Sequence, residues 1–269
     1  MDLFRDFFVV VPSGELARIG AILRGAGEDP VLEDSVVLVD ERQLLVLTGG
    51  GGGGRGTVEP WWSTYALQMA LKLLASSLMS TPYYLTLDAD VLCTKAVLSE
   101  EDLLPGGKGN YVPEGRHVHP AWWHASAATL GVDEDPQGGG FGVTPAVMST
   151  AGSMLALKRL KEVYGHIDFL NKMFDGFALV PERWWSEYTL YRTALDHFGA
   201  FDALHAVGPT KLIGDSVWYA EDFETWNATA AFNDDPAAFV VVQSTAGVDA
   251  SELTERVTRA MAGREAWQR

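Results

Sequence analysis

The chain has 269 residues and a formal net charge of −16, because 36 acidic side chains stand against 20 lysines and arginines. Its 47% hydrophobic and 11% aromatic content excludes a disordered chain, and its negative charge argues against nucleic acid and anionic membrane surfaces as partners. Cys93 is the only cysteine, so no intrachain disulfide can form. The sequence lacks a signal-peptide pattern, and its longest apolar stretch is interrupted by polar residues. We therefore expect a soluble, cytoplasmic protein with no membrane span, folded as a single domain over residues 1–269.

The first elements predict a strand–helix–strand unit. Residues 7–11 (FFVVV) form an unbroken apolar run, which is typical of a strand buried on both faces in a parallel sheet. Apolar side chains then recur at helical spacing over residues 16–23, and residues 36–39 (VVLV) form a second strand. We interpret residues 44–47 (LLVL) as a third strand. This alternation predicts an α/β fold with a right-handed parallel crossover.

A glycine run occupies residues 49–54. It lacks the Gly-Lys-Ser/Thr ending of a phosphate-binding P-loop, so a surface connection is the favoured interpretation. Arg55, directly after the run, can reach a diphosphate if the loop folds over it. The next segment predicts a helix over residues 60–78, in which Gln68 and Lys72 share one stripe. That polar stripe is either a solvent-facing side or a pair directed at a site.

Two carboxylates follow the next strand. Residues 83–87 (YYLTL) predict a short buried strand, and Asp88 and Asp90 come directly after it. Strand alternation would place both side chains on one face, at the sheet edge where open α/β folds bind ligands. Paired carboxylates repel each other unless a cation lies between them, and hard oxygen ligands suit Mg²⁺ or Mn²⁺. The alternative is a solvated turn after a strand.

The second half of the chain continues the alternation. Aromatic and imidazole side chains near Pro120 suit a sugar ring, with half-buried packing as the equal alternative. Residues 155–164 predict a helix, and another begins at Ser186, a natural N-cap. Residues 239–243 (FVVVQ) predict the last strand. A final helix follows Asp249, with Leu253, Val257 and Met261 on one face.

Taken together, these segments resemble a family of small GT-A-fold, nucleotide-sugar-dependent glycosyltransferases of bacteria, algae and large algal viruses, which includes viral rhamnosyltransferases. The matching segments, in family order, are residues 68–73 (QMALKL), 83–90 (YYLTLDAD), 119–122 (HPAW), 142–146 (GVTPA), 186–191 (SEYTLY) and 239–244 (FVVVQS). The chain departs from the family at its glycine run and at residues 61–64 (WWST). The resemblance implies a single GT-A-like domain with a mostly parallel central sheet flanked by helices.

The resemblance also implies an activity, the transfer of a hexosyl, deoxyhexosyl or pentosyl group from a UDP- or dTDP-linked sugar to a glycan or other hydroxyl acceptor. Asp88 and Asp90 would hold Mn²⁺ or Mg²⁺, which acts as a Lewis acid on the leaving diphosphate. The residues expected to bind the nucleotide sugar are Val11, Pro12, Asp40, Arg55, Gln68, Lys72, Asp88, Ala89 and Asp90.

Glu187, at a helix start, would be the general base of an inverting transfer, because a neutral hydroxyl is a poor nucleophile. The residues expected to bind the acceptor are His119, Trp122, Thr144, Trp185 and Tyr188. The structural alternative for Glu187 is a favourable charge on the helix dipole.

Two other functions fit parts of the sequence. A haloacid-dehalogenase-type phosphatase also places Asp-x-Asp after an apolar strand, with the first acid, here Asp88, as nucleophile. Lys211 and residues 214–216 (GDS) are similar to the later motifs of that phosphatase class. Against this reading, the Asp-x-Asp motif normally opens the phosphatase fold, whereas two or three predicted strands precede Asp88 here. A non-catalytic GT-A domain that only binds glycans is the third possibility.

Overall fold

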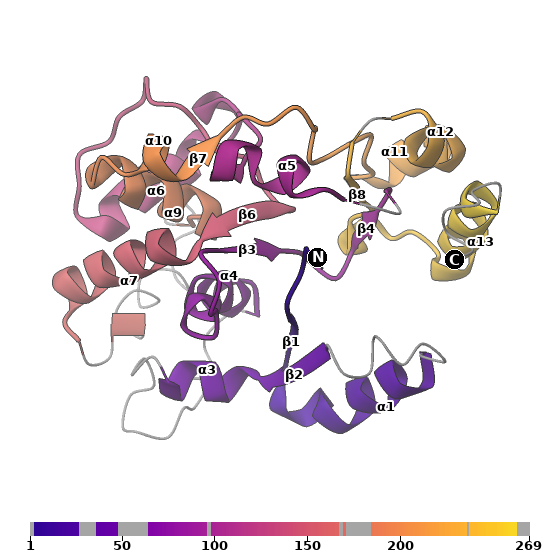
Figure 1. The fold of residues 1–269 in the computed structure, drawn as a ribbon, viewed down its shortest axis with the longest axis horizontal. Coiled ribbons are helices and arrows are strands. Elements are labelled where there is room, and N and C mark those ends of the chain that lie inside the picture. The colour runs from indigo at the N-terminus through magenta and orange to yellow at the C-terminus, as the bar shows by residue number, and fades with distance from the viewer. Residues whose placement is uncertain are drawn as a thin grey trace. The chain divides into compact units, whose positions relative to one another are not determined.

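The computed structural model divides the chain into two compact units (Figure 1). Unit 1 comprises Met1–Tyr84, Gly115–Gly140 and Ser149–Phe201, and unit 2 comprises Leu85–Glu114, Phe141–Met148 and Asp202–Arg269. The residues that the structure describes are 3–26, 36–47, 64–95, 98–166, 169–170, 184–235 and 237–262.

Strands and helices are interspersed through the described residues. The strands are β1 (Phe7–Val11), β2 (Val36–Asp40), β3 (Tyr83–Thr86), β4 (Val91–Cys93), β5 (Gly109–Asn110), β6 (Ala146–Ser149), β7 (His205–Ala206) and β8 (Phe239–Val241). The helices are α1 (Leu16–Ala26), α3 (Glu41–Leu47), α4 (Thr64–Leu74), α5 (Glu100–Leu103), α6 (Pro120–Leu130), α7 (Thr150–Tyr164), α9 (Glu187–His197), α10 (Phe201–Leu204), α11 (Ala220–Thr225), α12 (Ala228–Asn233) and α13 (Ala250–Met261).

The predicted strand–helix–strand unit is present at the start of unit 1. β1 pairs with β2 in parallel, with Val9 opposite Leu38 and Val11 opposite Asp40, and α1 connects the two strands. The prediction that β1 is buried on both faces is wrong, because Phe7 is 44% exposed and only Val11 is fully buried. Among the described residues β1 has one paired neighbour, so its apolar run is only partly covered.

The predicted third strand at residues 44–47 is also wrong, because these residues belong to helix α3. Leu44 and Leu45 are completely buried there. A four-residue apolar run does not distinguish a strand from a buried helical turn by its periodicity. The capping interaction decides in favour of the helix, since Asp40 Oδ1 accepts a hydrogen bond from the Arg42 amide at 2.9 Å, close to where the helix begins.

The other large helices described in unit 1 are α4, α6, α7 and α9. The predicted long helix is described as α4, followed by a short 3-10 turn at Ala75–Ser77, and residues 60–63 lie outside the described part. α7 contacts α4 and α9, and α6 contacts α9. Nine of the eleven residues of α9 are buried, so α9 is the central helix of this unit.

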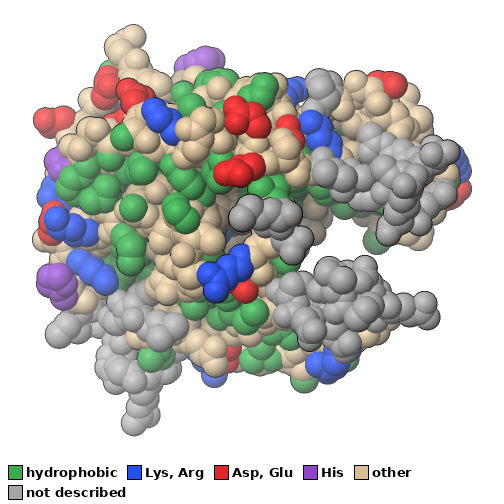
Figure 2. Space-filling model, in the orientation of Figure 1, with side chains coloured by type: hydrophobic (Ala, Val, Ile, Leu, Met, Phe, Trp, Pro, Cys, Tyr) green, Lys and Arg blue, Asp and Glu red, His purple; other side chains and the backbone are tan. Residues whose placement is uncertain are grey.

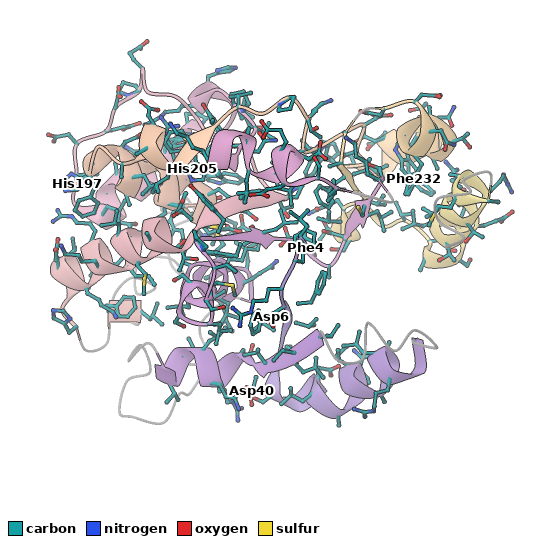
Figure 3. The ribbon with its side chains drawn as sticks, viewed as in Figure 1. Phe4, Asp6, Asp40, His197, His205 and Phe232 are labelled. Carbon is teal, nitrogen blue, oxygen red and sulfur yellow. The ribbon has the colours of Figure 1, made fainter. Side chains whose placement is uncertain are left out.

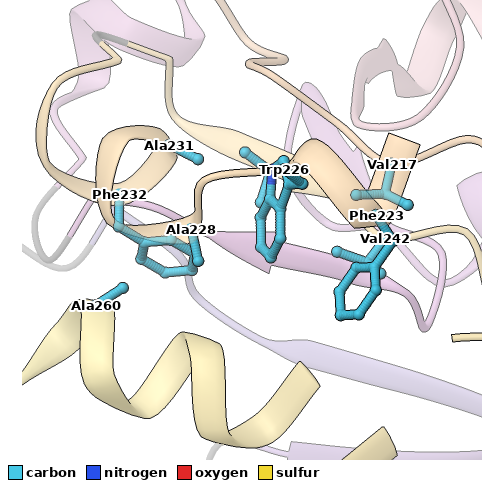
Figure 4. Packing of buried hydrophobic residues seen from close by; sticks show 9 residues of the cluster. Val217, Phe223, Trp226, Ala228, Ala231, Phe232, Val242 and Ala260 are labelled. Carbon is cyan, nitrogen blue, oxygen red and sulfur yellow. The ribbon is translucent and has the colours of Figure 1, made fainter. Parts of the chain in front are cut away.

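Unit 2 has its own hydrophobic core. β4 pairs with β8 in antiparallel fashion and β5 pairs with β7 in parallel. The side chains of Phe223, Trp226 and Phe232 belong to this core, together with Val242, directly after β8, and Ala260 of α13 (Figure 4). Leu253, Val257 and Met261 of α13 pack against this core, which confirms the predicted apolar face. Asp249 accepts hydrogen bonds from the amides of Ser251 and Glu252, which confirms the predicted helix start.

The fold is therefore mixed α/β, as predicted, with many helices and small sheets. In the described part of the chain the strands form two-stranded sheets, and β3 pairs with β6. A mostly parallel central sheet stays a prediction. Figure 2 shows acidic and basic side chains interspersed with apolar ones on one face of the described residues. None of the described helices is both long and apolar enough to cross a bilayer.

Candidate functional site

The two predicted metal ligands lie in a turn of unit 2. β3 ends at Thr86, and the carbonyl of Asp88 accepts a hydrogen bond from the Val91 amide at 3.2 Å. This bond closes a turn that leads into β4. The expected strand alternation is therefore wrong for Asp88 and Asp90, whose directions are set by the turn rather than by a pleated strand.

Other segments of unit 2 fix this turn in place. Thr144 Oγ1 accepts a hydrogen bond from the Asp88 amide at 3.2 Å. The carbonyl of Asp90 accepts from the Val242 amide at 3.0 Å, and its Oδ2 accepts from the Ser244 amide at 2.9 Å. The structure thus brings three of the matching sequence segments together around Asp90.

The second carboxylate oxygen of Asp90 has no hydrogen-bond partner among the residues that the structure describes. Oδ1 is buried, and it is one of two buried side-chain polar atoms without a hydrogen bond among the described residues. A buried carboxylate oxygen without a partner is unfavourable, and a cation offsets that cost. The described residues contain no group of three or more His, Cys, Asp or Glu side chains able to hold a metal. The free carboxylate oxygen of Asp90 is a hard donor of the kind that suits a Mg²⁺-type ion, which proteins commonly bind through one or two carboxylates plus substrate phosphates.

The predicted general base is at the expected place in unit 1. Ser186 is the N-cap of α9, and its Oγ accepts a hydrogen bond from the Tyr188 amide at 3.1 Å. Glu187 is the first residue of the helix and is only 4% exposed. The rigid helix start therefore fixes the position of the Glu187 backbone.

Lys72 is the partner of Glu187. Its Nζ lies 2.5 Å from Glu187 Oε1 and donates to Tyr188 Oη at 3.1 Å. The ammonium also lies 5.0 Å from the centroid of the Tyr188 ring. With side-chain exposures of 12% and 5%, Lys72 and Glu187 form a largely buried ion pair that joins α4 to α9. The sequence had assigned these two residues to different ligands.

Tyr84 closes this cluster from β3. Its Oη donates to the Lys72 carbonyl at 3.0 Å and lies 2.7 Å from Ser153 Oγ. Burial raises the pKa of Tyr84 well above its ordinary value of 10.0, so the hydroxyl stays protonated at neutral pH. We call Lys72, Glu187, Tyr188, Tyr84 and Ser153 the Glu187 cluster.

Three of the residues expected to bind the nucleotide sugar meet at the ends of β1 and β2. Val11 lies opposite Asp40 in the ladder, and Pro12 follows Val11. Ser13 Oγ donates to Asp40 Oδ1 at 2.6 Å, so this carboxylate already has local donors. Figure 3 labels Asp40, the last residue of β2. Burial, with the Asp40 charge second, raises the pKa of the adjacent Glu41.

The residues expected to bind the acceptor differ in accessibility. Trp185 and Tyr188 are buried, with exposed fractions of 1% and 3%, whereas Trp184 is 42% exposed. A buried ring cannot stack on a sugar without rearrangement, whereas Trp184 is accessible and packs against the Tyr65 ring. The His119 and Trp122 rings stack on each other, with centroids 3.9 Å apart.

For the remaining residues expected to bind the nucleotide sugar, the structure gives only their exposure or does not describe them. Ala89 is exposed in the turn between the two acids, and Gln68 is exposed on α4. Arg55 and the glycine run lie outside the described residues.

Sequence reasoning missed several polar residues. Ser244 and Ser153 were not singled out, because an isolated serine carries no spacing signal. Arg116, Arg192 and Asp196 are concentrated in a buried cluster of unit 1, although only the Arg192–Asp196 spacing of four residues was visible in the sequence. Burial of these arginines depends on tertiary packing, which periodicity does not reveal.

Comparison with known proteins places the chain without assigning an activity. No curated protein matches it. One family model matches residues 1–263, which is nearly the whole chain. The chain therefore belongs to this family, DUF6492, which is described as a family of unknown function.

Proposed function

We propose that the protein is a metal-dependent glycosyltransferase that moves a sugar from a nucleoside-diphosphate sugar, UDP- or dTDP-linked, to a hydroxyl acceptor such as a glycan. The observation that supports this most is the buried Asp90 Oδ1, which has no partner in the described part of the chain and lies in a turn that also carries Asp88. A buried carboxylate oxygen without a hydrogen bond, two residues along the chain from a second acid, is typical of a divalent-cation ligand in the absence of the cation. A solvated surface turn would not bury that oxygen.

The bound metal would act as a Lewis acid that neutralises charge on the leaving diphosphate. Asp88 and Asp90 are the residues that would hold it, and Mn²⁺ and Mg²⁺ suit their oxygen ligands. The backbone donors from Val242 and Ser244 fix the orientation of Asp90, so the carboxylate needs little rearrangement to bind.

Glu187 would take the proton from the acceptor hydroxyl as that oxygen attacks the anomeric carbon. One C–O bond to the acceptor forms while the C–O bond to the diphosphate breaks, which inverts the anomeric configuration. Lys72 holds Oε1, so the other carboxylate oxygen is the one assigned to the acceptor proton. The same burial would be found in a purely structural ion pair, so the test must separate stability from turnover.

A thermal-shift panel of nucleoside diphosphates with and without Mn²⁺ tests the binding half of this proposal. We expect UDP or dTDP to raise the melting temperature when Mn²⁺ is present and much less when EDTA replaces it, because a ligand stabilises the state that binds it. If none of the nucleotides has an effect with Mn²⁺, the proposal is wrong. Hydrolysis of p-nitrophenyl phosphate that is lost in Asp88→Asn would indicate the phosphatase instead. A shift with glycans alone would indicate a non-catalytic binding domain.

A further inference from the structure

Two buried arginines of unit 1 share a single carboxylate. Arg116 and Arg192 are each 8% exposed. Arg116 Nη2 donates to Asp196 Oδ2 at 2.7 Å, and Arg192 Nε lies 2.9 Å from both Asp196 oxygens. This cluster therefore carries two positive charges and one negative charge inside a chain whose formal net charge is −16.

Each nitrogen of the Arg116 guanidinium donates a hydrogen bond within the protein. Its Nε donates to the Gly139 carbonyl at 3.0 Å, and its Nη1 donates to the Asp135 carbonyl at 2.7 Å. Its Cζ lies 4.3 Å from the Trp123 ring centroid. Arg116 thus fastens the segment from Asp135 to Gly139 and is a structural residue.

Only the Nε side of the Arg192 guanidinium makes hydrogen bonds to the described residues. Nε is occupied by Asp196, while neither Nη1 nor Nη2 has a hydrogen-bond partner in the described part of the chain. These two nitrogens are not among the buried partnerless atoms there, which are Asp90 Oδ1 and Thr193 Oγ1. Each of these terminal nitrogens therefore keeps some exposure to solvent.

Phe201 and Gly139 lie next to the Arg192 guanidinium. Its Cζ lies 3.3 Å from the centroid of the buried Phe201 ring, which covers one guanidinium face. Gly139 lies beside the terminal nitrogens, and a Cβ at this position would come within 3.2 Å of Nη2 and 3.7 Å of Nη1. The absence of a side chain at Gly139 leaves room next to the two free donors.

We propose that Arg192, with the space at Gly139, forms a binding site for an oxyanion, a carboxylate or phosphate group. Two parallel N–H donors on a preorganised guanidinium match two oxygens of such a group, and the anion would offset the surplus positive charge of the cluster. The site needs neither the metal nor the sugar nucleotide, so it stands independently of the proposed function.

Titration of the purified protein with sodium phosphate and with sodium acetate, at constant ionic strength set with chloride and with EDTA present, tests this site. We expect a saturable rise in melting temperature with a Kd on the order of millimolar, because a ligand that binds the folded state stabilises it. Stronger binding of phosphate would identify a tetrahedral anion, and stronger binding of acetate would identify a carboxylate.

Two variants make the test specific. Arg192→Lys keeps the charge but loses the fork of two donors, and Gly139→Ala keeps Arg192 but fills the adjacent space, so each should weaken binding at least tenfold. Gly139 is not among the glycines with positive φ, so alanine introduces no backbone strain there. Arg259→Lys, in the exposed i,i+4 pair with Glu255, is the matched control and should bind as the parent does.

The proposal is overturned if phosphate and acetate stabilise the parent no more than chloride does. It is also overturned if Gly139→Ala and Arg192→Lys bind as tightly as the control. Should Arg192→Lys fail to fold, Gly139→Ala decides alone, because it changes the space and leaves the ion pairs intact. Failure of this test leaves the glycosyltransferase proposal untouched, since EDTA removes the metal from every arm.

Discussion

Asp90 is unusual because half of its carboxylate is satisfied and half is not. Oδ2 accepts from the Ser244 amide, whereas the buried Oδ1 has no partner among the described residues. An unpaired buried polar atom costs about 1–3 kcal/mol. The sequence could predict the presence of the acid pair but not this asymmetry, which depends on segments some 150 residues further along the chain.

Asp90→Asn should therefore leave the protein without metal at least as stable as the parent, since the amide removes a buried charge and its oxygen can still accept from Ser244. The increase in melting temperature produced by Mn²⁺ should be lost. Thermal melts with and without Mn²⁺ measure both effects. Asp215→Asn, at an exposed position of the same unit, is the control and should keep the Mn²⁺ response. An unchanged response in Asp90→Asn would remove Asp90 from the metal site.

The Lys72–Glu187 pair gives a second prediction at this scale. Glu187→Gln leaves the Lys72 ammonium largely buried without its counter-charge, so we expect a loss of about 2–4 kcal/mol in unfolding free energy. The double variant Glu187→Gln, Lys72→Met should lose less than the sum of the two single variants, because it removes both charges. Urea unfolding of the four proteins gives the coupling free energy.

Turnover separates the catalytic from the structural role of Glu187. If it is the base, Glu187→Gln lowers transfer per folded molecule by about a hundredfold or more while nucleotide binding stays. If the ion pair is only structural, the double variant regains stability and transfers sugar at nearly the parental rate. That second result would contradict the assignment.

At the scale of elements, helix α9 is held by its neighbours as much as by its own sequence. The start of α9 was predictable because Ser186 is a natural N-cap. The burial of α9 was not predictable, because nine of its eleven residues are buried and an amphipathic helix would bury only one stripe. Tyr191 shows the reason. Its side chain is completely buried and its Oη accepts from the Ser149 amide at 2.9 Å, at the start of α7.

Gly152 on α7 should be intolerant of a side chain for this reason. A Cβ at Gly152 would lie 2.5 Å from Tyr191 Oη, and a completely buried ring has no room to move. We expect Gly152→Ala to lower the unfolding free energy by about 1–3 kcal/mol. Gly25→Ala in α1, where nothing lies within 4 Å of the new Cβ, is the matched control. Because alanine favours helices, the control should gain up to about 1 kcal/mol, and chemical denaturation measures both.

Helix α5 gives a pH-dependent prediction. Burial alone would raise the pKa of Asp102, but hydrogen bonds from Thr210 and Ser99 and the charge of Lys95 outweigh burial and lower the pKa to about 2 from its ordinary value of 3.8. A lowered pKa stabilises the fold above pH 3.8, and this contribution is lost as the pH falls from 3.8 towards 2.

Asp102→Asn should therefore reduce the unfolding free energy by about 1–2 kcal/mol at pH 7, after a discount for partial exposure. The difference between variant and parent should shrink below pH 3.8 and vanish near pH 2. Urea midpoints of both proteins from pH 7 to pH 2 measure this. A difference that stays constant over that range would mean that the charge of Asp102 is not responsible.

At the scale of the whole molecule, local signals predicted the elements better than their pairing. The strands near residues 7, 36, 83 and 239 and the helices near 16, 155, 187 and 250 are where the sequence places them. Residues 44–47 were misassigned because a short apolar run carries no period. The two compact units could not be predicted, because each is assembled from three separate segments without a linker between them.

For the candidate site, too, the sequence predicted individual residues better than the contacts between them. The acid pair and the helix-start glutamate were visible as residue types at strand and helix ends, whereas the expectation that Val11 and Asp40 serve one ligand came from the family resemblance. The Lys72–Glu187 contact joins residues 115 positions apart, and the burial of Trp185 against the exposure of Trp184 depends on how α9 packs. Neither follows from spacing along the chain.

Release of nucleoside diphosphate from a panel of nucleotide sugars, measured with Mn²⁺ and an acceptor glycan mixture, tests the central claim most directly. We predict that one UDP- or dTDP-linked donor is consumed, that EDTA and Asp90→Asn each abolish its consumption, and that Asp215→Asn does not. Consumption that continues in EDTA and in Asp90→Asn, or no consumption of any donor by a protein whose melting temperature Mn²⁺ and nucleotide leave unchanged, would contradict the account.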